Sequence, residues 1–372
     1  MEATNKNTFT EDMTPAFSFG LPFIFVPLMI TAWIYGGWTI LAVPIFGYVI
    51  ITIFDFLIGT KLIAPKFKSD EDNKKYKIIL FAWPPIQLFL IFGSLVVIFS
   101  FEHFSFIEAV GLMLVQGLIT GAVGIVFAHE LMHQKTRFER FLSDLLMGMA
   151  IYGHFRTEHV LVHHRHVGTE NDAVTARFGE GFYKFFIRIV LQCFLSAWNT
   201  EKEMLTKKER PFWDFLNPFY IYFGLSILFL ISSFLIGGVL GVLCFFIQAF
   251  IAVLHLEVVN YIEHYGLVRQ KLENGKFEPT KPHHSWNANH HASNLLLINL
   301  QKHSDHHARP NKTYESLQSY DENDAPQLPF GYPLMVLISL IPALWRKVMD
   351  PKVIEWRNKF YPDLTDWGKS QT

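Results

Sequence analysis

"LPFIFVPLMITAWIYGGWTILAVPIFGYVIITIFDFLIG", residues 21–59, contains a single charged side chain, Asp55. About 20 apolar residues in a helix cross the hydrocarbon core of a membrane, so this run predicts two crossings hinged at Gly36-Gly37. Similar runs follow along the chain. The sequence predicts six transmembrane helices at about 20–36, 37–58, 78–100, 106–128, 217–236 and 239–262. We therefore expect an all-α integral membrane fold, with residues 1–372 forming a single membrane-embedded domain.

The composition excludes several classes of protein. Charged residues make up 17% of the 372 residues, below the roughly 25% of typical soluble domains, and the net charge of −1 argues against a nucleic-acid partner. The two cysteines, Cys193 and Cys244, form no CxxC pair, which excludes a disulfide framework and a four-cysteine metal site. Glu2, Glu11 and Asp12 precede the first apolar run, a pattern that does not match a secretory signal.

The distribution of positive charge predicts the orientation in the membrane. Lysines crowd the segment between the second and third apolar runs: Lys61, Lys66, Lys68, Lys74, Lys75 and Lys77. The opposite connections, Gly36-Gly37, 101–105 and Gly237-Gly238, carry no Lys or Arg. Basic loops stay in the cytoplasm, so we expect cytoplasmic termini and a cytoplasmic helical cap over residues 129–212 and 265–372.

Histidines cluster where the predicted helices leave the membrane. The clusters are "HELMH" (129–133), "EHVLVHHRH" (158–166), "NYIEHYG" (260–266) and "LQKHSDHHARP" (300–310). Residues spaced i, i+3 and i+4 share one face of a helix, so the imidazoles within a cluster can converge. A single histidine is more often an ordinary hydrogen-bonded residue, but several clusters at one membrane face indicate a site for transition metals.

The number of clustered histidines separates the possible metal sites. "HELMH" matches the zinc-protease pattern H-E-x-x-H, in which Glu130 would be the general base, but a zinc protease needs only one further ligand. Nine clustered imidazoles exceed what one tetrahedral zinc binds, and two metals with four or five imidazoles each account for them better. A metal transporter is a third possibility, although transporters place their ligands near the bilayer midplane rather than at helix ends.

Taken together, these segments resemble the integral-membrane alkane 1-monooxygenases, within the histidine-rich di-iron family of membrane desaturases and hydroxylases. The resemblance extends through most of the chain and includes "KPHHSWNANH" (281–290), "GYP" (331–333) and "VMDPKV" (348–353). "NYIEHYGL" and the HSDHH form of the last box are typical of alkane hydroxylases. One segment differs, because "NDAVTAR" (171–177) lacks the proline that usually follows the aspartate.

The resemblance implies a centre of two non-haem iron ions and no catalytic residue beyond the metal ligands. The implied ligands are His129, His133, His159, His163, His164, His264, His303, His306 and His307. Five further histidines fall in matching segments without being implied as ligands: His154, His166, His283, His284 and His290. His255 and His291 stand where the pattern calls for no histidine, and we expect them to be structural.

Four carboxylates adjoin ligand histidines in sequence: Glu130, Glu158, Glu263 and Asp305. Adjacent residues on a helix point about 100° apart, so we do not expect these carboxylates to bind the same metal. We expect them to orient the imidazoles instead, with ordinary surface ion pairs as the alternative.

The implied activity is the O2-dependent terminal hydroxylation of medium- to long-chain n-alkanes to primary alcohols, in a bacterial inner membrane. Alternatives at the same type of site are aryl-methyl hydroxylation and fatty-acyl desaturation. The chain has no nucleotide fingerprint and no cysteine cage, so electrons must come from outside; the resemblance implies rubredoxin, reduced by an NADH-dependent rubredoxin reductase. An acidic rubredoxin could dock on the basic residues Lys202, Lys207, Lys208, Arg210, Lys302, Arg309 and Lys312.

Substrate length is predicted to depend on the second apolar helix. Family members often limit chain length with a bulky side chain there, and Gly47 lies about two turns before Asp55. A glycine at this position would leave a substrate tunnel open to alkanes beyond about ten carbons. The alternative is that Gly47 only allows close packing between helices.

Overall fold

The computed structural model describes residues 14–64, 70–364 and 367. Within these residues the chain is helical, with isolated β-bridges and no strand, so the predicted all-α class is confirmed. Lys66 and Lys68 of the predicted basic loop, and the acidic residues Glu2, Glu11 and Asp12, lie outside the described residues.

The elements follow one another in three stretches of the chain. The first comprises η1 (Ala16–Ile24), α1 (Phe25–Tyr35), η2 (Gly37–Leu41), α2 (Ala42–Pro44), the π-helix η3 (Ile45–Ile50), α3 (Ile51–Ile58), α4 (Asp70–Ser100), α5 (Phe106–Ile119), the π-helix η4 (Thr120–Gly124) and α6 (Ile125–Met132). The second comprises α7 (Arg137–Met149), α8 (Phe155–Thr157), the π-helix η5 (Glu158–His163), α9 (His164–His166), α10 (Phe182–Lys207) and α11 (Phe219–His264). The third comprises η6 (Pro282–His284), α12 (His291–Leu296), α13 (His303–Ala308), η7 (Tyr314–Ser316), α14 (Tyr332–Ser339) and α15 (Pro342–Phe360).

Five helical stretches in the described residues are long and apolar enough to cross a membrane: Ala16–Tyr35, Gly37–Ile58, Lys74–Ser100, Phe106–Met132 and Phe219–His264. The first two are separated where the sequence predicts a hinge, because Gly36 has φ 57° and ψ −150°. A left-handed φ of this kind favours glycine, which has no Cβ to clash with the backbone.

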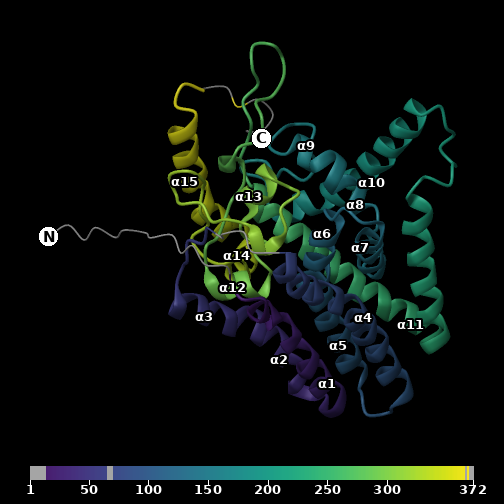
Figure 1. The fold of residues 1–372 in the computed structure, drawn as a ribbon. Coiled ribbons are helices and arrows are strands. Elements are labelled where there is room, and N and C mark those ends of the chain that lie inside the picture. Colours follow the sequence, from purple (N-terminus) through teal and green to yellow (C-terminus); the bar gives the residue numbers. More distant parts are fainter. Residues whose placement is uncertain (1–13, 65–69, 365–366, 368–372) are drawn as a thin grey trace.

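The last apolar stretch, α11, consists of two helices joined at Gly237 and Gly238. Its 46 residues would extend about 69 Å as one straight helix, more than twice the thickness of a hydrocarbon core. Instead the chain folds back, so that a Cβ on Gly241 would clash with the carbonyl oxygen of Ser233, and Figure 1 shows the sharp bend. The two halves correspond to the predicted spans 217–236 and 239–262. α14 and α15 form a further bent pair at 120°, within the segment assigned to the cap.

The C-terminal segment packs on the end of the second apolar helix. Asp55, the one charged residue of the opening run, is buried and accepts a hydrogen bond from the Ser293 N–H at 3.0 Å. The Lys61 N–H donates to the Asn289 carbonyl at 2.9 Å. Figure 1 shows α12 and α14 lying against α3 as a result. This contact brings the last histidine cluster to the ends of the apolar helices.

Two glycines hold the fourth apolar stretch tightly against α11. A Cβ on Gly117 would lie 2.6 Å from the Gln248 carbonyl oxygen, and one on Gly121 would lie 2.7 Å from the Cβ of His255. No other residue fits such close approaches, which are typical of helix pairs in membranes. Because α6 continues this stretch, the packing also fixes where "HELMH" emerges beside the end of α11.

Candidate metal centre

α6 contributes His129 and His133, one turn apart at the end of the fourth apolar stretch. Both imidazoles face the interior, and their ring centroids are 5.3 Å apart. The i, i+4 spacing in an α-helix places the two rings on the same face, as expected from the sequence.

The second histidine segment forms a π-helix. In η5 the turn closes at i→i+5, so His164 lies on the same side as His159, with 3.0 Å between their Nε2 atoms. His163 points elsewhere, and its Nε2 lies 3.2 Å from that of His307. The π-helix therefore divides one sequence cluster between two directions.

α13 contributes the last three histidines from six residues, all but Ala308 buried. His303 and His307, spaced i, i+4, have their Nε2 atoms 3.0 Å apart, and the Nε2 of His303 lies 3.1 Å from that of His264. His306 turns away from them, and its Nε2 lies 3.1 Å from that of His164.

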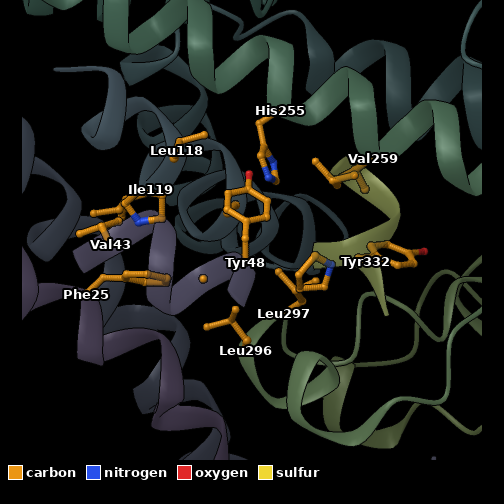
Figure 2. A pocket seen from close by; sticks show the side chains of 15 residues that line it. Phe25, Val43, Tyr48, Leu118, Ile119, His255, Val259, Leu296, Leu297 and Tyr332 are labelled. Atoms are coloured by element: carbon orange, nitrogen blue, oxygen red, sulfur yellow. The ribbon is translucent and has the colours of Figure 1, made fainter. Parts of the chain in front are cut away.

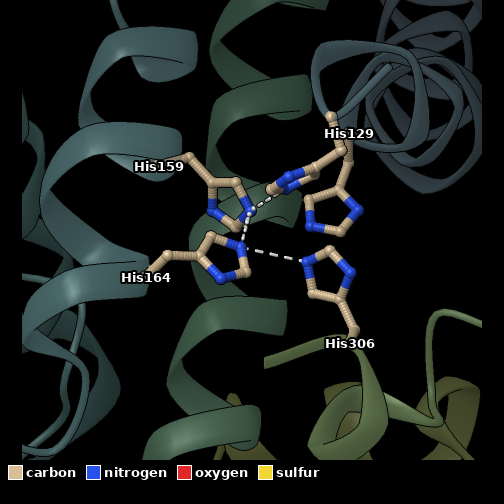
Figure 3. Close-up of side chains that lie close together, drawn as sticks. His129, His159, His164 and His306 are labelled. Atoms are coloured by element: carbon tan, nitrogen blue, oxygen red, sulfur yellow. Dashed lines mark hydrogen bonds between the residues drawn. The ribbon is translucent and has the colours of Figure 1, made fainter. Parts of the chain in front are cut away.

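All nine predicted histidines come together in two groups. The first group contains His129, His133, His159, His164 and His306. The second contains His163, His264, His303 and His307. Within each group the candidate ligand atoms lie within 4.8 Å of one another, and Figure 3 shows rings of the first group converging on a common point. His163 and His164 are adjacent in sequence but belong to different groups, and the same is true of His306 and His307. The two groups therefore lie side by side.

The arrangement of these rings suits metal binding better than hydrogen bonding between the rings. Burial lowers the pKa of His133 to about 3 and lowers the pKa of His159 and of His164 well below the usual value. A neutral imidazole has a lone pair on one ring nitrogen, so rings whose Nε2 atoms converge can present these lone pairs to one point. The buried Nε2 of His129 has no hydrogen-bond partner among the described residues. Such a donor set, made of imidazole nitrogens only, suits transition metals.

The four carboxylates next to these histidines have different surroundings. Glu263 lies 3.3 Å from the Nδ1 of His303 and accepts a hydrogen bond from the Tyr332 hydroxyl at 3.0 Å. Glu130 accepts from Gln134 at 2.7 Å, and the oxygens of Glu158 have no hydrogen-bond partner among the described residues.

Asp305 faces away from the metal groups and organises the loop after α13. Its carboxylate accepts from Lys312 at 2.8 Å, from the Gln318 N–H at 3.1 Å and from the Tyr320 hydroxyl at 3.1 Å. Of the four, Glu263 is the one at ion-pair distance from a ring of either group, but the His303 Nδ1 makes no hydrogen bond to a described residue.

Asp172, which was not among the predicted site residues, lies beside His163. Its Oδ2 lies 3.0 Å from the Nδ1 of His163 and accepts from the Thr175 hydroxyl at 2.6 Å, while its Oδ1 accepts from the Val174 N–H at 3.1 Å. A carboxylate on the far nitrogen of a ligand imidazole fixes which nitrogen faces the metal. The available signal was the lone aspartate of "GTENDA", a few residues after the second histidine cluster.

The other histidines lie outside both groups. His283 and His284 form a third group with Glu278, but the Tyr361 hydroxyl lies between them, 2.7 Å from the His284 Nε2, 3.2 Å from the His283 Nε2 and in a short hydrogen bond to Glu278. These polar atoms are thus already paired. The ring of His154 packs on Tyr152 and Phe194, His166 and His291 are partly exposed, and His290 forms a β-bridge with Thr60.

One residue predicted to belong to the basic docking surface does not lie at the surface. Lys302 is buried, and its ammonium donates to the Leu317 carbonyl at 2.9 Å. Burial lowers its pKa to about 7. The assignment of Lys302 to a surface for an acidic partner is therefore wrong, because the packing of the loop after α13 removes it from solvent. Lys202, Lys207, Lys208, Arg210 and Arg309 are exposed.

An apolar pocket lies between the second apolar helix, α5, α11 and α14, and we call it the cavity. Its walls include Phe25, Val43, Pro44, Gly47, Tyr48, Leu118, Ile119, Ala122, His255, Val259, Leu296, Leu297, Tyr332, Pro333 and Val336 (Figure 2). A Cβ on Gly47 would meet only the Phe25 ring, at 3.5 Å, which is an ordinary contact. Close helix packing therefore does not require glycine here, in contrast to Gly117 and Gly121.

The cavity wall comes near the second histidine group, although none of the four histidines lines the cavity. Val259 lies five residues before His264 on α11, and the hydroxyl of Tyr332 is bonded to Glu263, which lies beside His303. A ligand in the cavity could therefore contact Tyr332, whose hydroxyl is hydrogen-bonded to the carboxylate beside His303.

Comparison with known proteins agrees with this site. Residues 105–339, more than half of the chain, match the family model for fatty acid desaturases. Alkane 1-monooxygenase 2 of Pseudomonas aeruginosa is 38% identical over 320 residues, which cover 85% of this chain and 84% of that protein. Alkane 1-monooxygenase of Acinetobacter baylyi is 37% identical over 326 residues, covering 87% and 78%.

A more distant relative is named for a different class of substrate. The hydroxylase component of xylene/toluene monooxygenase from Pseudomonas putida is 29% identical over 258 residues, covering 68% of this chain and 67% of that protein. The higher identities and fuller coverage lie with the alkane enzymes. The chain belongs to the alkane 1-monooxygenase family, within the histidine-rich superfamily of membrane desaturases and hydroxylases.

Proposed function

We propose that this protein hydroxylates the terminal methyl group of medium- to long-chain n-alkanes. One oxygen atom of O2 enters the C–H bond to give a primary alcohol, and the other is reduced to water with two electrons and two protons from outside the chain. The observation that carries the proposal is the pair of all-histidine groups, together with an apolar cavity whose wall residue Tyr332 is hydrogen-bonded to Glu263 beside His303. The names and identities of the relatives support the same reaction.

The nine histidines would hold two non-haem iron ions, five imidazoles on one and four on the other. Five imidazoles in one group exceed the four ligands of a tetrahedral zinc site, which favours a metal of higher coordination number such as iron. Bound there, reduced iron would supply the activation of O2 that an unactivated C–H bond requires.

The chain's own residues would select and position the substrate. An alkane offers no hydrogen-bonding group, so an apolar cavity recognises it by shape and by the exclusion of water. Gly47 leaves the cavity open at the second apolar helix, and Asp172 holds the ring of His163 in place. Holding the chain end in one position raises the effective concentration of its methyl group at the site.

Electrons would come from rubredoxin, itself reduced by an NADH-dependent rubredoxin reductase. The exposed basic residues at the end of α10 and beyond, Lys202, Lys207, Lys208 and Arg210, are candidates for steering an acidic donor. Lys207 is paired with Glu203 at 2.6 Å and Arg210 with Asp214 at 2.8 Å, so an incoming donor would compete with these carboxylates.

We place the protein in a bacterial inner membrane as a single domain, residues 1–372, with both termini and the cap, 129–212 and 265–372, in the cytoplasm. Counting the two halves of α11 as separate spans gives six crossings, an even number that is consistent with termini on the same side. The absence of Lys and Arg from Gly237-Gly238 supports an outer location for that bend.

A second candidate substrate class is the methyl group of an arene, favoured by the relationship to the xylene/toluene enzyme. The two reactions are distinguished by supplying purified protein with rubredoxin, its reductase and NADH, and either n-octane, n-dodecane or toluene. We expect 1-octanol and 1-dodecanol, about two irons per chain, and O2 consumption that depends on substrate. Exclusive conversion of toluene, or full activity with a single zinc, would overturn the proposal.

A further inference from the structure

Three side chains with a polar atom line the otherwise apolar cavity: Tyr48, His255 and Tyr332. The Tyr332 hydroxyl is already hydrogen-bonded to Glu263, which leaves Tyr48 and His255. Figure 2 shows the Tyr48 hydroxyl directed toward the His255 ring, and the two ring centroids are 6.2 Å apart. An alkane can use neither group. Hydrogen-bonding groups in the wall of an otherwise greasy cavity therefore need a different explanation.

Both groups lack partners within the described residues. His255 is only 7% exposed, and its buried Nδ1 has no hydrogen-bond partner among the described residues. Neither the His255 Nε2 nor the Tyr48 hydroxyl makes a hydrogen bond to a described residue. A buried polar group without a partner is destabilising and is rare in folded proteins. Such a group, aimed into a cavity, points to a ligand that carries a complementary atom.

The fold fixes both side chains at this position. The position of His255 is fixed by close packing between α11 and η4. The two helices approach so closely there that a Cβ on Gly121 would lie only 2.7 Å from the His255 Cβ. Tyr48 belongs to the π-helix η3, next to Gly47, and its ring lies on the opposite wall. The pair is therefore a built feature of the cavity and does not depend on mobile loops.

We propose that Tyr48 and His255 form a subsite for a neutral oxygen atom, a hydroxyl or carbonyl, on an otherwise apolar chain. The pair can donate to and accept from a hydroxyl, which would satisfy the groups that are unpaired in the cavity. Tyr48 and His255 would then be specificity-determining residues that favour chains with such an oxygen over plain alkanes. This inference rests on the proposed function, because it uses the same cavity and the same reacting methyl group.

The geometry also sets the length of that chain. His255 lies nine residues before His264 on α11, a rise of about 13 Å at 1.5 Å per residue. An extended hydrocarbon chain with bonds of about 1.5 Å advances about 1.3 Å per carbon, so about ten carbons separate the oxygen from the methyl end. A 1-alkanol of about ten to twelve carbons is thus of the length that separates the level of His255 from the level of His264 along α11, and its terminal hydroxylation would yield an α,ω-diol.

The test compares 1-dodecanol with n-dodecane in the purified, iron-loaded protein. We expect His255→Leu to lower the ratio of kcat/KM for 1-dodecanol to kcat/KM for n-dodecane about tenfold, the factor contributed by one hydrogen bond. Tyr48→Phe should lower the same ratio and serves as the second variant if His255→Leu does not fold. The matched control is Phe250→Leu, on the exposed side of the same helix, which should leave the ratio unchanged.

A binding measurement separates this subsite from the reaction. Without O2 and donor, radiolabelled 1-dodecanol should bind the wild type more tightly than His255→Leu, again by about tenfold. If the wild type fails to hydroxylate n-dodecane, the proposed function fails, but the binding result still decides whether the subsite exists. Equal effects of His255→Leu on both compounds, in rate and in binding, would overturn the inference.

Discussion

Replacing Gly47 with tryptophan should shift the preference of the enzyme toward shorter alkanes. Gly47 lines the cavity, and a Cβ there meets only the Phe25 ring at 3.5 Å, so the new side chain can enter the cavity without a backbone clash. An indole about 5 Å long would occupy the path of about four methylene groups, at about 1.3 Å each.

The size of the shift follows from the burial of those methylene groups. Each buried CH2 contributes about 0.8 kcal/mol, so four of them contribute about 3 kcal/mol. This corresponds to a factor of about 200 in kcat/KM between alkanes that reach past Gly47 and those that do not. Gly47→Ala adds a single methyl group and should shift the preference by only a few-fold, which makes it the matched control.

The assay is a competition among n-alkanes from octane to hexadecane, in which the primary alcohols are quantified by gas chromatography. Iron content is measured in parallel, because a variant that folds should keep both metals. The reasoning would be refuted by an equal loss of activity on short and long alkanes with normal iron content. Loss of iron together with aggregation would indicate that Gly47 has a packing role after all.

Three further results are expected. His306→Ala should lose metal from the five-histidine group and His307→Ala from the four-histidine group, so Mössbauer spectra of the two variants should differ; retention of two irons in either would contradict the assignment. Asp172→Asn should weaken metal binding ten- to a hundredfold, measured by chelator competition, because it removes the carboxylate on the His163 Nδ1; unchanged affinity would exclude this role. Reversal of both Lys207 and Lys208 to Glu should raise the KM for rubredoxin and reduce its salt dependence, whereas turnover of the wild type that is insensitive to salt at limiting donor would reject electrostatic steering.

The sequence was sufficient to predict the features that depend on neighbours along the chain. Apolar runs of about 20 residues require no knowledge of the fold to indicate membrane helices, and the break at Gly36 was readable from a glycine pair in such a run. The i, i+4 spacing of His129 and His133 likewise places both rings on one helical face, because that relation depends only on the geometry of a single helix.

Which rings meet across the structure was decided only by the tertiary fold. His163 and His164 are adjacent in sequence yet join different groups, because η5 is a π-helix and its turn closes at i→i+5. Asp172 reaches His163 through the path of a loop. Lys302 reads as a surface cation in the sequence but is buried by the packing of the segment after α13.

The physical reason for this division is the range over which each interaction acts. Helix geometry fixes the relative direction of side chains four residues apart, so sequence spacing alone specifies local faces and lengths. The convergence of several helices on two metal positions, and the opening of a cavity between Gly47 and His255, depend on packing between segments about 200 residues apart. Those distances are set by close contacts such as Gly121 against α11, which no local pattern records.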